Sequence, residues 1–124
     1  MSATKIGFGR RLALSSLLVA AASPAHAHAH LVSVTPRAGA GASVATQLTL
    51  IFSEVIELGL SGIALAGPGG AVATGAASLD AKDGVTLTVP LDAPLAPGNY
   101  HVEWHVLARD GHRTQGAYDF TVAP

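Results

Sequence analysis

The stretch "YHVEWHV", residues 100–106, alternates large apolar residues with polar ones along its whole length. A period of two on β-branched and aromatic residues is typical of a strand with one buried face. The residues expected to face the core are Tyr100, Val102, Trp104 and Val106, and those expected to face solvent are His101, Glu103 and His105.

The same alternation recurs in short runs separated by Gly and Pro, and no segment shows a helical stripe. The other expected strands are "HLVSV" (30–34), "QLTLIF" (47–52), "GIALAG" (62–67), "AVAT" (71–74), "VTLTV" (85–89) and "AYDFTV" (117–122). About seven short strands with turn signals between them predict an all-β fold, a single antiparallel Greek-key β-sandwich of the immunoglobulin-like kind. Neither a repeat nor a second domain is expected.

Residues 1–27 differ in character from the rest of the chain. They combine a basic start with an apolar run, Leu12–Ala22, and with small residues at Ala25 and Ala27. This order is typical of a cleaved secretory signal peptide, and the run is too short to span a bilayer. An uncleaved anchor is the alternative. We expect cleavage after Ala27, a functional domain over residues 28–124, and a periplasmic location.

Composition narrows the chemistry of that domain. Its eight acidic residues outnumber its four Lys and Arg, a net charge of −4, which argues against a nucleic-acid partner. The chain has no cysteine, and its one methionine is Met1. Thiolate sites, blue-copper centres and disulfides are therefore excluded.

Two groups of residues are candidate metal ligands. Cleavage would make His28 the first residue, so its α-amine and ring nitrogen could chelate one ion in the nitrogen-rich geometry that Cu(II) favours. In "RDGH", Asp110 and His112 stand two apart, and in an extended segment both side chains leave the same side. Turn residues without a metal role are the alternative for the second pair.

Two further arrangements stay open from the residues alone. A free His28-Ala29-His30 terminus can also bind Cu(II) or Ni(II) through its amine, two amide nitrogens and the His30 ring, without any fold. His101, Glu103 and His105 could hold a second ion, although a solvated polar face is the better interpretation.

The stretches "HAHLVSVTPRAGA", "LTLIFSEVIE", "PGNYHVEWHVLARDGH" and "GAYDFTV" resemble the copper resistance protein C (CopC) family of periplasmic copper carriers. The resemblance spans residues 28–124 and implies a cupredoxin-like sandwich. It implies that Cu(II) is held by the amine and ring of His28, the ring of His112 and an oxygen of Asp110. It also places Glu54 near the ion as an acceptor or occasional ligand, and we expect His30 to add an auxiliary nitrogen. The methionine-rich Cu(I) segment of some members has no counterpart here.

The resulting expectation is a monomeric periplasmic Cu(II)-binding protein, not an enzyme, which sequesters copper or delivers it to an inner-membrane copper transporter. One alternative is an enzyme like the copper monooxygenases, which also chelate copper through an N-terminal histidine. The other is a metal-free immunoglobulin-like interaction module.

Overall fold

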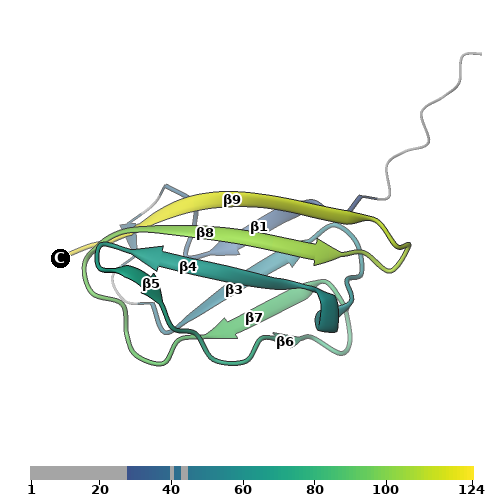
Figure 1. Ribbon diagram of the computed structural model, residues 1–124, viewed down its shortest axis with the longest axis horizontal. Coiled ribbons are helices and arrows are strands. Elements are labelled where there is room, and N and C mark those ends of the chain that lie inside the picture. Colours follow the sequence, from purple (N-terminus) through teal and green to yellow (C-terminus); the bar gives the residue numbers. More distant parts are fainter. Residues whose placement is uncertain (1–27, 40, 43–44) are drawn as a thin grey trace, which may run out of the picture.

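The computed structural model describes residues 28–39, 41–42 and 45–124, and these residues form two β-sheets packed face to face (Figure 1). A single 3₁₀ turn, η1, covers Leu58–Leu60. The strands are β1 (Leu31–Thr35), β2 (Gly41–Ala42), β3 (Gln47–Phe52), β4 (Gly62–Gly67), β5 (Gly70–Val72), β6 (Ser78–Leu79), β7 (Thr86–Pro90), β8 (Gly98–Leu107) and β9 (Arg113–Val122).

One sheet has the strand order β1-β3-β7-β6 and the other has the order β2-β9-β8-β4-β5. All pairs are antiparallel except β2 and β9, which run parallel. The predicted β-sandwich is confirmed. The two strands beyond the expected seven, β2 and β6, have two residues each, which is too short for an alternating pattern to be recognised.

The core lies between the sheets, and β8 shows why the alternation predicted it. Along β8 the side chains of Tyr100, Val102, Trp104 and Val106 are buried, whereas the intervening residues are exposed. Trp104 meets Phe52 of β3 edge to face, with ring centroids 5.3 Å apart, and Tyr100 stacks on Phe120 of β9. These aromatic contacts hold β3, β8 and β9 at fixed positions.

Gly116 of β9 makes room for Trp104. The two residues pair across β8 and β9, and a Cβ at position 116 would lie 2.5 Å from Cζ2 of the indole. Because only glycine lacks a Cβ, a glycine at 116 allows the indole to lie directly on β9.

No helix in the described part of the chain has the length and apolar character needed to cross a membrane.

Candidate metal site

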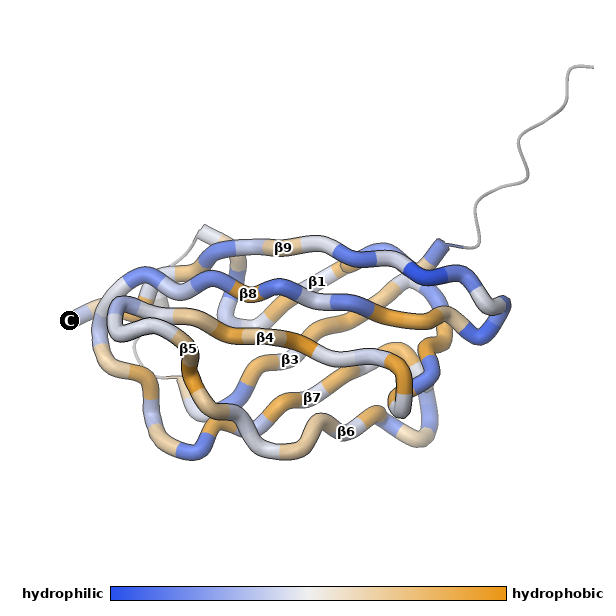
Figure 2. The backbone as a smooth tube through the Cα atoms, viewed as in Figure 1, coloured by the Kyte–Doolittle hydropathy of each residue, from blue (hydrophilic) through white to orange (hydrophobic). Residues whose placement is uncertain are grey.

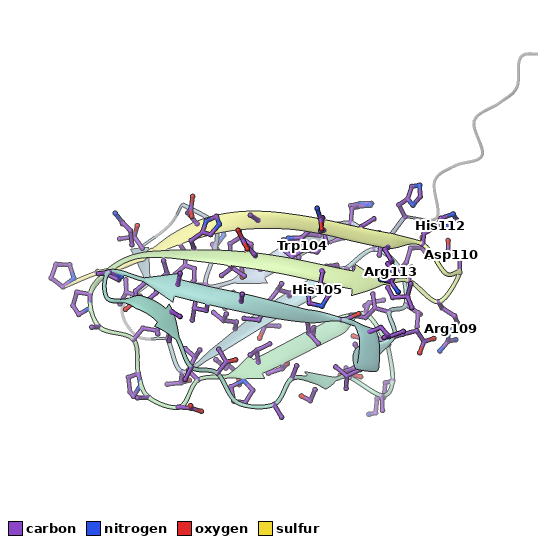
Figure 3. All side chains as sticks on the ribbon, viewed as in Figure 1. Trp104, His105, Arg109, Asp110, His112 and Arg113 are labelled. Atoms are coloured by element: carbon purple, nitrogen blue, oxygen red, sulfur yellow. The ribbon has the colours of Figure 1, made fainter. Side chains whose placement is uncertain are left out.

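The candidate ligands gather at one end of the sandwich. The β8–β9 turn, which carries Asp110 and His112, lies at this end (Figure 3). The turn is hydrophilic, and the described chain begins beside it (Figure 2). Two segments far apart in sequence therefore meet there.

The turn that carries Asp110 and His112 is tight rather than extended. The N–H of Gly111 donates to the Ala108 carbonyl at 2.9 Å, and the N–H of Ala108 donates to the His112 carbonyl at 2.9 Å. Gly111 has a φ of +92°, a conformation that favours glycine. The extended segment predicted for these two residues is wrong, although their side chains still meet across this turn.

Asp110 holds His112 through both carboxylate oxygens. Oδ1 accepts from the His112 N–H at 2.9 Å, and Oδ2 lies 3.0 Å from His112 Nδ1. The side-chain contact with His112 is the main cause that lowers the pKa of Asp110, and the backbone N–H of His112 and the nearby charge of His28 lower it further. An ionised carboxylate only accepts, so Nδ1 carries the proton and Nε2 keeps a free lone pair for an ion.

The first described residues are anchored by Ala29. Its side chain is fully buried, and its carbonyl accepts a hydrogen bond from Thr114 Oγ1 at 2.6 Å. The neighbours His28 and His30 are both exposed. A buried alanine between two exposed histidines fixes this short segment against the start of β9.

Ser53, directly after β3, holds the same segment from the other side. Its N–H donates to the His30 carbonyl at 2.9 Å, which continues the β1–β3 ladder. Its Oγ accepts from the His30 N–H at 3.0 Å and lies 3.0 Å from His30 Nδ1. The ring of His30 is thus engaged by Ser53.

His28 meets His112 directly. Their ring centroids are 4.6 Å apart and their planes are inclined by 76°. Both rings are within reach of one ion, since metal–nitrogen bonds are about 2.0 Å long. The structure therefore places His28 beside His112, and Asp110 contacts His112 from its other ring nitrogen.

The donor set fits Cu(II). Imidazole nitrogens with a carboxylate and no sulfur suit Cu(II) and Ni(II) better than Cu(I). Among the residues that the structure describes, no three His, Asp or Glu side chains already surround one point. Two imidazoles at this end therefore need a further donor, and the backbone nitrogen of His28 is adjacent to them.

Glu54 lies close to this end of the sandwich. It is exposed and lines a pocket of about 320 Å³ together with Val55, Ala108, Arg109 and Asp110. This position is compatible with the expected auxiliary role, which stays a prediction.

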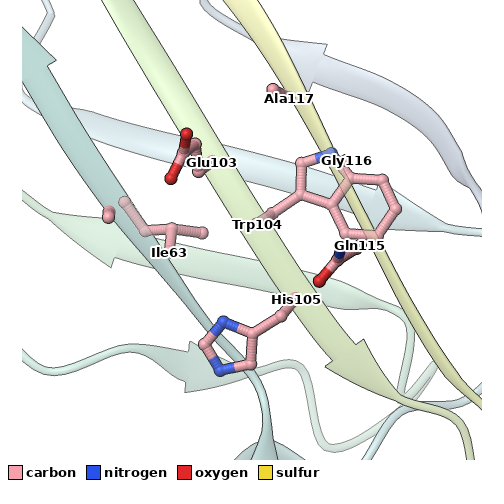
Figure 4. Close-up of a pocket in the computed structure, with 8 residues that line it drawn as sticks. Ile63, Glu103, Trp104, His105, Gln115, Gly116 and Ala117 are labelled. Carbon is pink, nitrogen blue, oxygen red and sulfur yellow. The ribbon is translucent and has the colours of Figure 1, made fainter.

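The histidines of β8 lie elsewhere, on the outer face of the five-stranded sheet. His101 Nδ1 is 2.6 Å from Asp119 Oδ1, and His101 Nε2 is 3.5 Å from Glu103 Oε1. The contact with Asp119 is the main cause that raises the pKa of His101. Glu103 and His105 border a shallow pocket over β4, β8 and β9 (Figure 4). These side chains are exposed, as expected of a polar face.

Ser53, Thr114 and Ala29 were missed as site residues by the sequence reasoning. Ser53 lies within the stretch "LTLIFSEVIE" quoted above, but the position of a serine in the sequence does not indicate which residue its hydroxyl contacts. The expected signal peptide and its cleavage site lie outside the described residues.

Comparison with known proteins agrees with this fold. Residues 31–123 match the family model of the CopC domain. Protein YobA of Escherichia coli K12 is 45% identical over 76 residues, which is 60% of this chain. The chain spans only 61% of the length of YobA in that match, and YobA of Shigella flexneri matches equally.

Two solved structures share the fold. CopC from Methylosinus trichosporium OB3b is 34% identical, with a TM-score of 0.71, over 78% of this chain and 95% of that protein. PcoC, a methionine-rich copper resistance protein from Escherichia coli, is 29% identical, with a TM-score of 0.71, over 77% and 99%.

Proposed function

The chain belongs to the CopC family, and from this premise we propose that it is a copper resistance protein that binds Cu(II) between His28 and His112. One observation carries the proposal. The two imidazoles come from opposite ends of the described chain, yet their centroids lie 4.6 Å apart at an exposed end of the fold. Core packing does not account for this contact between the two rings, because neither ring belongs to the core.

In the proposed site, His28 supplies its α-amine and one ring nitrogen, and His112 supplies Nε2. Asp110 orients the His112 ring through Nδ1. The expectation that it also gives the ion an oxygen stays a prediction, and it would require the carboxylate to leave Nδ1. His30 is left out of the proposed site, because adding its nitrogen to the ion would require this ring to leave Ser53.

The amine is a donor only if the chain begins at His28. We therefore include export in the proposal: residues 1–27 act as a signal peptide, and its removal in the periplasm creates the ligand. Processing and metal binding are then coupled, because precursor and mature chain differ in one ligand.

The chemistry proposed is capture and release, not catalysis. Deprotonated amine and imidazole nitrogens bind Cu(II), so acid releases the ion by protonating them. Reduction to Cu(I) weakens binding to the same donors, because they are hard and contain no sulfur. Transfer to an inner-membrane copper transporter by ligand exchange is the delivery step we propose for a monomer.

The test is a competitive Cu(II) titration against a coloured chelator, with the protein starting at His28. We expect His112→Ala and His28→Phe each to weaken binding by more than about 100-fold, since loss of a ligand should exceed the effect of losing its orienting partner. His105→Ala removes an exposed histidine of β8 and serves as the matched control. Wild-type affinity in His112→Ala would refute the proposed site.

A further inference from the structure

We propose that Ser53 selects between two copper sites that the same terminus can form, and that it suppresses the one that needs no fold. The inference rests on the proposed function, because both sites use the α-amine of His28. It assigns to Ser53 a positioning role that determines the metal specificity of the protein.

The competing site has fixed requirements. An amine, two amides and an imidazole in the order His28-Ala29-His30 enclose a Cu(II) or Ni(II) ion in a square plane. The four donors are the His28 amine, the amide nitrogens of Ala29 and His30, and His30 Nδ1. Both amides must lose their protons to solvent as the ion binds.

Ser53 Oγ occupies two of those four donors. It accepts a hydrogen bond from the His30 amide N–H at 3.0 Å, so this proton is held in place. It also lies 3.0 Å from His30 Nδ1, and its hydroxyl proton is shared between that nitrogen and the His28 carbonyl oxygen, which is 3.5 Å away. One oxygen thus engages both nitrogens that His30 would contribute.

Ala29 and Thr114 add to the same restraint. Wrapping the tripeptide around an ion would pull the fully buried Ala29 from the core and break the 2.6 Å bond from Thr114 to its carbonyl. It would also separate the His30 carbonyl from the Ser53 N–H. His28, which precedes these anchors, stays beside His112.

The consequence is a preference among metals. Ni(II) accepts the square four-nitrogen site, whereas the His28–His112 site relies on the Cu(II) affinity of two imidazoles and an amine. By holding His30, Ser53 keeps the terminus in the folded site and disfavours capture of Ni(II).

The experiment titrates Cu(II) and Ni(II) into protein whose first residue is His28, followed by EPR for copper and visible absorption for both metals. The variants are Ser53→Ala, Ser53→Ala/His30→Ala, His30→Ala and His112→Ala. Ser33→Ala, an exposed serine of β1, is the matched control. Thermal unfolding of each variant checks that the fold persists.

We expect Ser53→Ala to bind Ni(II) about tenfold more tightly than wild type, since at least one hydrogen bond no longer opposes the competing site. The gain should come with the four-nitrogen spectrum, and Ser53→Ala/His30→Ala should lose both. Ser33→Ala should behave as wild type. The single variant His30→Ala should give the same Cu(II) spectrum as wild type. This result does not depend on how Ser53→Ala folds.

Two results would overturn the inference: Ni(II) affinity in Ser53→Ala equal to wild type, or a wild-type Cu(II) spectrum that changes when His30 is replaced. His112→Ala separates this failure from that of the proposed function. If wild type needs His112 for copper and Ser53→Ala gains no Ni(II) binding, only the role of Ser53 is wrong.

Discussion

Asp110 determines which ring nitrogen of His112 is free to bind a metal ion. Both of its oxygens contact His112, and this contact turns Nε2, rather than Nδ1, toward any ligand. Its pKa is lowered by that contact, so the carboxylate stays ionised throughout the neutral range. A small acidic residue in a turn thus determines which nitrogen of a histidine is free.

Asp110→Asn is expected to weaken Cu(II) binding by about 10–100-fold, the usual cost of losing a carboxylate that orients a ligand. The amide no longer carries the charge that holds Nδ1–H. The measurement is the competitive titration, with Asp92→Asn, an exposed acid outside the site, as control. An unchanged affinity in Asp110→Asn would show that the orientation of His112 does not depend on the carboxylate.

Tyr118 shows a different effect at the residue scale. Its hydroxyl is buried and has no hydrogen-bond partner among the described residues, and burial raises its pKa to about 12. The unfolded chain ionises near the ordinary value of about 10, so it binds fewer protons than the native state between these values. The native state therefore loses stability as pH rises from about 10 to 12.

Tyr118→Phe should remove that part of the pH dependence. At neutral pH it should be as stable as wild type or more stable by up to about 1 kcal/mol, because an unsatisfied buried hydroxyl is gone. Urea unfolding at pH 7 and pH 11 measures both effects. A wild type and a variant that lose stability in parallel above pH 10 would contradict the assignment.

At the scale of elements, the β8–β9 hairpin supplies buried side chains to the core, and its turn carries Asp110 and His112 of the candidate site. Its alternation predicted which side chains are buried, because strand geometry sends successive side chains to opposite faces. Its turn was predicted less well. The residues around Gly111 were predicted to be extended, because the sequence does not show that a φ of +92° at this glycine brings Asp110 onto His112.

Gly116→Ala should destabilise this hairpin by about 1–3 kcal/mol, the usual cost of forcing an added methyl into a packed core. The new Cβ would lie 2.5 Å from the Trp104 indole, so the ring or β9 must shift. Urea unfolding followed by tryptophan fluorescence reports both stability and the indole environment. Gly59→Ala, whose Cβ would meet nothing within 4 Å, is the control, and equal losses in the two variants would contradict the packing argument.

At the scale of the whole molecule, the sandwich brings the first described residues, 28–30, to a turn near the end of the chain. The sequence predicted His28, Asp110 and His112 as a group, because the residues suggested copper chemistry and the family resemblance joined them. It did not predict that Thr114 holds the Ala29 carbonyl or that Ser53 holds His30. Such contacts form because a serine or threonine hydroxyl lies next to a distant segment in the folded protein. No residue spacing in a single sequence predicts that proximity.

The proposed copper site is complete only if a free amine at His28 binds the ion. The direct measurement compares Cu(II) affinity and EPR spectrum for two proteins, one beginning at His28 and one carrying a single extra glycine before it. We predict that the glycine weakens binding by about 100-fold or more and alters the spectrum, since the amine is displaced from the His28–His112 pair. Equal affinities with identical spectra would contradict the claim and place the copper on internal side chains alone.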